Sequence, residues 1–174
     1  MSGSRVVALL RGVNVGGVAM PMAEVREAVG ERGGRGVRTF LASGNIVLDA
    51  PEPAADTAQL VSGALHDRFG YTAWVWFGSL ERVHAIIDGF PFETDEAAHH
   101  PYVTFADDGH LLDELAAAAS PDGPAGDRAV RADGVLYWEA PRGGTLASAL
   151  SKLSARSRYA TTTTRNLRTL RKLA

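Results

Sequence analysis

The pattern of apolar and polar positions predicts alternating strands and helices in the first half of the chain. Residues 6–10 are apolar at every position, as expected of a strand covered on both faces. Residues 22–29 carry apolar side chains at helical spacing, and residues 37–49 are typical of a hairpin. A second amphipathic helix over 60–69, capped by Asp56 or Thr57, and a strand over 73–77 complete the order β-α-β-β-α-β.

The second half of the chain repeats this type of pattern. After a helix capped by Ser79, the predicted elements are a strand over 101–105, a helix over 111–119 opened by Asp107-Asp108, a hairpin turning on Asp133-Gly134, a helix capped by Thr145, and a last helix over 167–173. No internal sequence repeat accompanies the repeated order. We therefore predict an α+β fold of two ferredoxin-like halves with a C-terminal helix, over residues 1–78 and 79–174, forming one compact unit.

Composition and charge narrow the class of protein. The 174 residues include no cysteine, which excludes disulfides and thiolate metal sites, and no apolar run approaches the roughly 20 residues that span a bilayer. The expected location is therefore cytoplasmic, with no membrane partner. Residues 142–174 contain eight Lys and Arg and no Asp or Glu. This basic tail indicates either a phosphate-bearing partner or docking on the acidic remainder of the chain.

A glycine-rich loop follows the first strand and is the first candidate site. In Arg11-Gly12-Val13-Asn14-Val15-Gly16-Gly17, backbone N–H groups of the glycines could hold a phosphate or carboxylate, with Arg11 and Asn14 as side-chain donors. The loop matches neither of the common glycine-rich phosphate motifs and has no lysine. A tight turn with Asn14 in the left-handed region is the alternative.

Two shorter segments are weaker candidates. Ser43-Gly44-Asn45 lies at the tip of the predicted hairpin, which we place at the end of the sheet opposite the exit of the first strand, and turn chemistry alone explains its residue types. Lys152, within Ser151-Lys152-Leu153, belongs to an amphipathic helix in the acid-free tail. Its alternative interpretation is an ordinary solvated charge.

The stretch before the last helix is the fourth candidate. Four threonines at 161–164 are followed by Arg165 and Asn166, and hydroxyls at a helix start can cap the helix while its uncapped amides attract an anion. A plain capping role explains the residues equally well.

No residue set identifies a reaction, so whether the protein is an enzyme, and with which cofactor, stays open. The adjacent His99 and His100 point apart on regular structure and have no further ligand at metal spacing. An RNA-recognition module would need aromatic residues on the first and third strands, which have none. Trp74 and Trp76 lie on the fourth strand and fit a core or an interface better.

Three segments together resemble one bacterial family, the domain of unknown function numbered sixteen-ninety-seven. They are residues 7–17, residues 38–45, and Ser151-Lys152-Leu153 with residues 163–166. The resemblance implies an α+β fold with ferredoxin-like halves and brings no settled activity, cofactor or catalytic residue. This chain departs from the family pattern at Val18-Ala19, at Ala42 and at Leu167-Arg168.

These candidates combine into one functional hypothesis: a cytoplasmic protein that binds a phosphate-bearing small molecule or nucleotide. Its ligand-binding residues would be Arg11, Asn14, Gly16, Gly17, Ser43, Asn45, Lys152, Thr164, Arg165 and Asn166. The hypothesis requires these distant segments to meet in one cleft. The alternatives are weak nucleic-acid binding through the basic tail, which we disfavour, and a structural or interaction protein of unknown oligomeric state.

Overall fold

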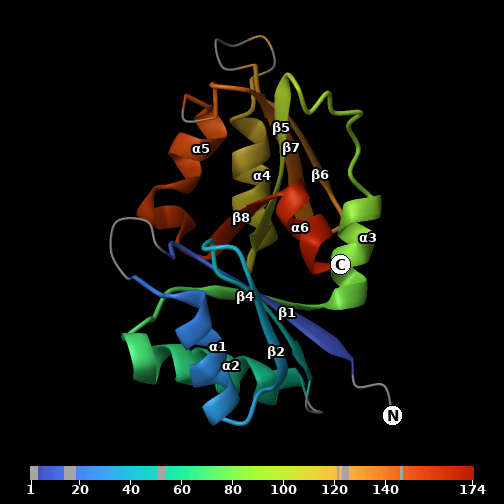
Figure 1. Ribbon diagram of the computed structural model, residues 1–174. Coiled ribbons are helices and arrows are strands. Elements are labelled where there is room, and N and C mark those ends of the chain that lie inside the picture. The colour runs from blue at the N-terminus through green and yellow to red at the C-terminus, as the bar shows by residue number, and fades with distance from the viewer. Residues whose placement is uncertain (1–3, 14–18, 51–53, 121, 123–125, 146) are drawn as a thin grey trace. The chain divides into compact units, whose positions relative to one another are not determined.

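Two compact units make up the chain in the computed structural model (Figure 1). The first comprises Met1–His84 with Lys172–Ala174, and the second comprises Ala85–Arg171. The structure describes residues 4–13, 19–50, 54–120, 122, 126–145 and 147–174.

The first unit is a four-stranded antiparallel sheet with two helices on one face. In chain order it contains β1 (Arg5–Leu10), α1 (Met22–Glu31), β2 (Arg35–Phe40), β3 (Asn45–Asp49), α2 (Ala54–Phe69) and β4 (Val75–Ser79). The strands are ordered β2-β3-β1-β4, which is the ferredoxin-like arrangement (Figure 1). The fold class predicted from the pattern is therefore confirmed here.

Burial of β1 on both faces follows from its uninterrupted apolar sequence. Val6, Ala8 and Leu10 alternate toward the core that α1 and α2 cover, while Val7 and Leu9, on the opposite face, are also fully buried. Residues 6–10 of the strand carry no polar side chain, so this part is favoured where both faces are removed from water.

The second unit repeats the same topology. Its strands are β5 (His99–Ala106), β6 (Arg128–Ala132), β7 (Val135–Pro141) and β8 (Thr162–Asn166), in the order β6-β7-β5-β8. The helices of this half are α3 (Leu80–Asp88), which begins in the first unit, α4 (Gly109–Ala117), α5 (Ala149–Ser154), the short 3₁₀ helix η1 (Ser157–Tyr159) and α6 (Leu167–Leu173). A separate apolar cluster lies between this sheet and α4, α5 and η1.

Local signals that were strong in the sequence correspond to observed caps and turns. The Ser79 hydroxyl accepts a hydrogen bond from the Arg82 amide, and the Asp108 carboxylate accepts one from the His110 amide. Asp133 and Gly134 both have positive φ, 52° and 74°, as the tight turn of a two-residue hairpin requires. These three predictions are confirmed.

Three predicted boundaries are wrong. Helix α2 begins at Ala54, so Asp56 and Thr57 lie inside it and do not precede it. Helix α5 begins after Ser148, whose hydroxyl accepts from the Ser151 amide, and not after Thr145. The run Thr162–Asn166 is strand β8, because β-branched threonines suit an extended backbone that can pair with β5.

Candidate functional site

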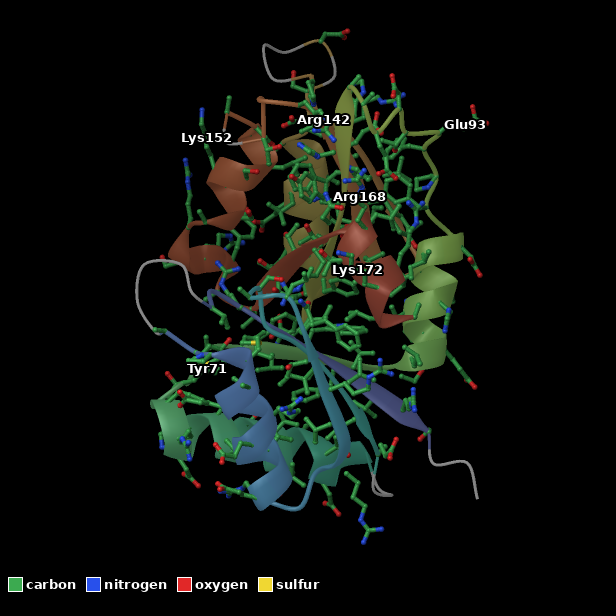
Figure 2. The ribbon with its side chains drawn as sticks, viewed as in Figure 1. Tyr71, Glu93, Arg142, Lys152, Arg168 and Lys172 are labelled. Carbon is green, nitrogen blue, oxygen red and sulfur yellow. The ribbon has the colours of Figure 1, made fainter. Side chains whose placement is uncertain are left out.

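The end of strand β1 is fixed by a tyrosine from a distant part of the chain. The Arg11 amide donates a hydrogen bond to the Tyr71 hydroxyl oxygen at 2.8 Å, and that hydroxyl donates to the Arg11 carbonyl at 2.6 Å. Gly70, with a φ of 64°, ends α2 and turns the chain so that Tyr71 reaches β1. Tyr71, labelled in Figure 2, is almost fully buried. Both backbone groups of Arg11 are thus bonded to one side chain.

The Arg11 side chain is half-buried at this strand end. Loss of water around the guanidinium lowers its pKa, and the neighbouring Tyr71 opposes part of that shift. Arginine nevertheless stays protonated at any physiological pH. A cation that has lost part of its hydration interacts more strongly with an anion than a fully solvated one does.

The hairpin tip lies beside Arg11, contrary to the sequence prediction. Strand β1 is antiparallel to β3, with Leu9 opposite Asn45, and the Leu10 amide donates to the Gly44 carbonyl at 2.9 Å. Because β1 and β2 are both antiparallel to β3, they run in the same direction, and the β2–β3 turn therefore comes at the end where β1 stops. The prediction that placed this tip at the opposite end of the sheet is wrong.

Within the tip, Asn45 bonds to Ser43 and to the backbone. The buried Asn45 amide donates to the Phe40 carbonyl at 2.8 Å and to the Ser43 hydroxyl at 2.9 Å. Gly44 has a φ of 79°, and a Cβ at that position would lie 2.8 Å from the Leu10 Cβ. These contacts support the turn interpretation of the segment, and they bring its backbone close to β1.

The remaining candidates of the first loop, Asn14, Gly16 and Gly17, lie outside the described residues. Gly12 is described, with a φ of 65° and open space where a Cβ would be.

Thr164, Arg165 and Asn166 do not form the start of a helix. They belong to β8, where the Thr164 and Thr104 hydroxyls are 2.8 Å apart across the β5–β8 pair. The Asn166 carboxamide oxygen accepts from the Arg168 amide, so Asn166 caps α6, and the threonines do not. The predicted helix N-terminus made of threonines is therefore wrong. The strand alternates its side chains between two faces, so neighbouring residues cannot converge on one anion.

Arg165 is buried, with 5% of its surface exposed. Its guanidinium donates to the Thr163 hydroxyl at 2.8 Å and to the Thr164 carbonyl at 2.9 Å. These bonds within β8 engage one nitrogen of the group that the sequence suggested as an anion donor.

Lys152 is exposed on α5 and extends away from the helix (Figure 2). Within the part of the chain that the structure describes, no carboxylate lies at ion-pair distance from it. The helix starts nearby on a buried network in which the Asp127 carboxylate accepts from the Ser148 hydroxyl at 2.8 Å and from the Ala149 amide at 3.1 Å. Lys152 belongs to the second unit and Arg11 to the first.

Much of the basic tail is paired with acids of the second unit. Glu96 accepts hydrogen bonds from Arg168 and Arg171, which lower its carboxyl pKa. On α4, Glu114 is bonded to Arg158 and, at 2.9 Å, to the Tyr159 hydroxyl; Arg158 first and Tyr159 second lower the pKa of Glu114 to about 2. The docking of the tail on acidic parts of the chain accounts for these three arginines.

The described residues of the first unit form hollows on either side of α2. A hollow of about 310 Å³ lies between α1 and α2 and is lined by charged side chains that pair with one another, including Arg32 with Asp67 and Arg68 with Glu31. A hollow of about 350 Å³ lies between α2 and the segment that leads into β4. Its lining residues are Ser62, His66, Tyr71, Thr72, Ala73, Trp74 and Val75.

Sequence reasoning missed Tyr71 and the buried Glu139. Tyr71 carries one signal, its position directly after the helix-ending Gly70. Glu139 carries another, since it stands between apolar residues of a central strand; its carboxylate is bonded to Arg128 and, at 2.8 Å, to the Thr94 hydroxyl.

Among the described residues, no group of three or more potential ligands could hold a metal ion. Nor is any described helix long and apolar enough to cross a membrane.

Comparison with known proteins places this chain among proteins without an assigned activity. A family model described as "Protein of unknown function (DUF1697)" matches residues 4–137, so the motifs at 151–153 and 163–166 lie outside the match. A solved structure, that of the conserved bacterial protein SP0830 from Streptococcus pneumoniae, is similar over 98% of this chain and 96% of its own, with a TM-score of 0.79 and 20% identity. At that identity the similarity shows the fold alone. No curated protein matches the chain.

Proposed function

The chain belongs to the DUF1697 family, which is described only as of unknown function. We propose from the geometry at the end of β1 that the protein binds a small molecule that carries a phosphate group. The observation that carries the proposal is the half-buried Arg11, held by Tyr71 beside the hairpin tip. A guanidinium can bind a phosphate through two parallel hydrogen bonds, because its planar fork of donors matches the spacing of the phosphate oxygens.

The ligand would meet Arg11 together with groups from the neighbouring loops. The Ser43 hydroxyl and the backbone around Gly44 lie on the adjoining hairpin, and the glycine loop that contains Asn14, Gly16 and Gly17 continues from Arg11. Lys152, Thr164, Arg165 and Asn166 belong to the second unit and are separate candidates, of which Lys152 is the exposed one.

The test measures binding of inorganic pyrophosphate by thermal unfolding and by calorimetry. Pyrophosphate should raise the melting temperature of the wild-type chain, since a ligand that binds only the native state stabilises it. In Arg11→Gln the affinity should fall by roughly tenfold or more, the scale expected for one charge-assisted pair. Lys152→Gln, measured in the same way, tests whether Lys152 of the second unit contributes to pyrophosphate binding.

Arg26→Gln is the matched control. Arg26 is an exposed arginine on α1, so its substitution changes the net charge equally and should leave pyrophosphate binding unchanged. The proposal fails if millimolar pyrophosphate does not stabilise the wild-type protein. It also fails if Arg11→Gln and Arg26→Gln weaken pyrophosphate binding to the same extent.

A second candidate function is weak nucleic-acid binding through the basic tail. Its support is the run of cations at 142–174, and the ion pairs of Arg158, Arg168 and Arg171 with Glu114 and Glu96 argue against it. If it holds, affinity must fall steeply with added salt.

A further inference from the structure

We propose that the hollow between α2 and β4 binds a planar heteroaromatic ring, a nucleobase, of the same ligand whose phosphate meets Arg11. This inference rests on the proposed function and makes the ligand a nucleotide. Three features of the first unit lead to it: the shape of the hollow, the chemistry of its lining, and its connection to Arg11.

The hollow has a volume that accommodates a single ring. Its volume is about 350 Å³, at the small end of the range for small-molecule sites. Tyr71, with 6% of its surface exposed, belongs to its inner wall, and the partly buried Trp74 lines it as well. The indole of Trp74 offers a flat, polarisable surface against which a base can stack.

The polar side chains of the lining are two hydroxyls and one imidazole. Ser62, His66 and Thr72 are exposed at the hollow, and each can donate and accept a hydrogen bond. Among the described residues that line it there is no Asp, Glu, Lys or Arg, in contrast to the hollow between α1 and α2. This combination suits an uncharged ring with hydrogen-bonding edges, and it does not suit a phosphate or a cation.

Tyr71 connects the hollow to Arg11. The residue lines the hollow, while its hydroxyl bonds to both backbone groups of Arg11 at 2.8 and 2.6 Å. A ligand with its ring against Trp74 and its phosphate at Arg11 would therefore reach across the position of Tyr71. That arrangement matches a molecule in which a sugar separates a base from its phosphate.

Tryptophan fluorescence and equilibrium dialysis test the hollow with defined probes: the four ribonucleosides, their monophosphates, and inorganic pyrophosphate. Stacking on an indole should quench its emission, so at least one nucleoside should quench the wild-type protein. Trp74→Phe should abolish that quench while dialysis shows that binding persists, because a phenyl ring still stacks. In Trp74→Ala the affinity should fall roughly tenfold, the scale of one base–aromatic contact.

Trp76→Phe is the matched control. Trp76 lies over Gly78 on β4 and does not line the hollow, so its substitution should leave the nucleoside-dependent quench in place. A quench that disappears in Trp76→Phe and persists in Trp74→Phe would overturn the inference.

The probes separate failure of this inference from failure of the proposed function. One result would overturn the inference and leave the proposed function standing. In that case pyrophosphate binding depends on Arg11, no nucleoside binds, and Trp74→Ala does not change the affinity for any monophosphate. Nucleoside binding at Trp74 without any gain from a phosphate would support the hollow as a ring site and overturn the proposed function together with the nucleotide assignment. Monophosphates that bind at least tenfold more tightly than their nucleosides, and lose that gain in Arg11→Gln, would support both.

Discussion

At the residue scale, single backbone positions decide how closely the segments around Arg11 approach one another. Gly44 and Gly12 both have positive φ, 79° and 65°, and lie on the two segments that meet at the end of β1. They differ in their surroundings, because a Cβ on Gly44 would lie 2.8 Å from the Leu10 Cβ and 3.0 Å from a Val13 methyl, whereas one on Gly12 would meet nothing within 4 Å. Of these two glycines, only Gly44 is packed so closely against its neighbours that a Cβ would crowd them.

This difference predicts unequal effects of the same substitution. Gly12→Ala should lower the free energy of unfolding by about 1–2 kcal/mol, the conformational penalty of a left-handed alanine. Gly44→Ala should add an overpacking penalty of roughly 1–3 kcal/mol, because Leu10 and Val13 belong to the buried core. Urea denaturation of both variants measures the two values. Equal destabilisation, or a larger effect of Gly12→Ala, would contradict the crowding at Gly44.

At the element scale, strands and helices with strong local signals were predictable, and those defined by a partner were not. The Asp133-Gly134 hairpin needs only its turn residues, and both have the expected positive φ. Strand β8 is five residues long, and its identity depends on pairing with β5, which is far away in sequence. Threonine and arginine side chains near a helix fit a cap as well as an edge strand, so the pattern alone could not distinguish the two.

Helix α4 and the turn η1 are joined by an ion pair that predicts a pH dependence. Arg158 and Tyr159 lower the pKa of Glu114 from 4.5 to about 2, so the folded state favours the ionised carboxylate. A lowered pKa contributes stability above the ordinary value and loses it as the pH falls from 4.5 toward 2. The difference in free energy of unfolding between wild type and Glu114→Gln should therefore shrink over this range.

Denaturant unfolding across that pH range measures the difference, with Glu81→Gln as the control. Glu81 is an exposed glutamate on α3 with no ion pair among the described residues, so its substitution should give a difference that varies little with pH. A pH-independent difference for Glu114→Gln would contradict the ion pair.

At the scale of the whole molecule, the charge that looks separated along the sequence is partly neutralised in the fold. Residues 142–174 carry only cations, yet Arg168 and Arg171 both bond to Glu96, and Arg142 donates to the Glu96 carbonyl. Glu96 lies 72 positions before Arg168 and 75 positions before Arg171 in the chain. The basic tail is therefore less available to a polyanion than its sequence suggests.

Releasing these arginines should increase affinity for a polyanion. Glu96→Gln should bind single-stranded DNA more tightly than the wild type does, with a salt slope steeper by roughly 0.7 for each arginine that reaches a phosphate. Glu93→Gln removes the same charge from an exposed residue of the same segment, with no ion pair among the described residues, and should behave like the wild type. Titrations at several salt concentrations measure the slopes. Identical slopes for the two variants would show that the tail is not held by Glu96.

The sequence by itself determined the fold class and the helical and strand character of most segments, and the resemblance of its motifs indicated the family. The fold class and the elements depend on apolar periodicity and on turn residues that act over a few neighbours, so local physics suffices for them. The tertiary structure alone decided that Tyr71 holds Arg11, that the tip at Gly44 lies beside β1, and that Thr162–Asn166 is a strand. Each of these depends on pairing between residues that are distant along the chain, and no local pattern encodes which partners will meet.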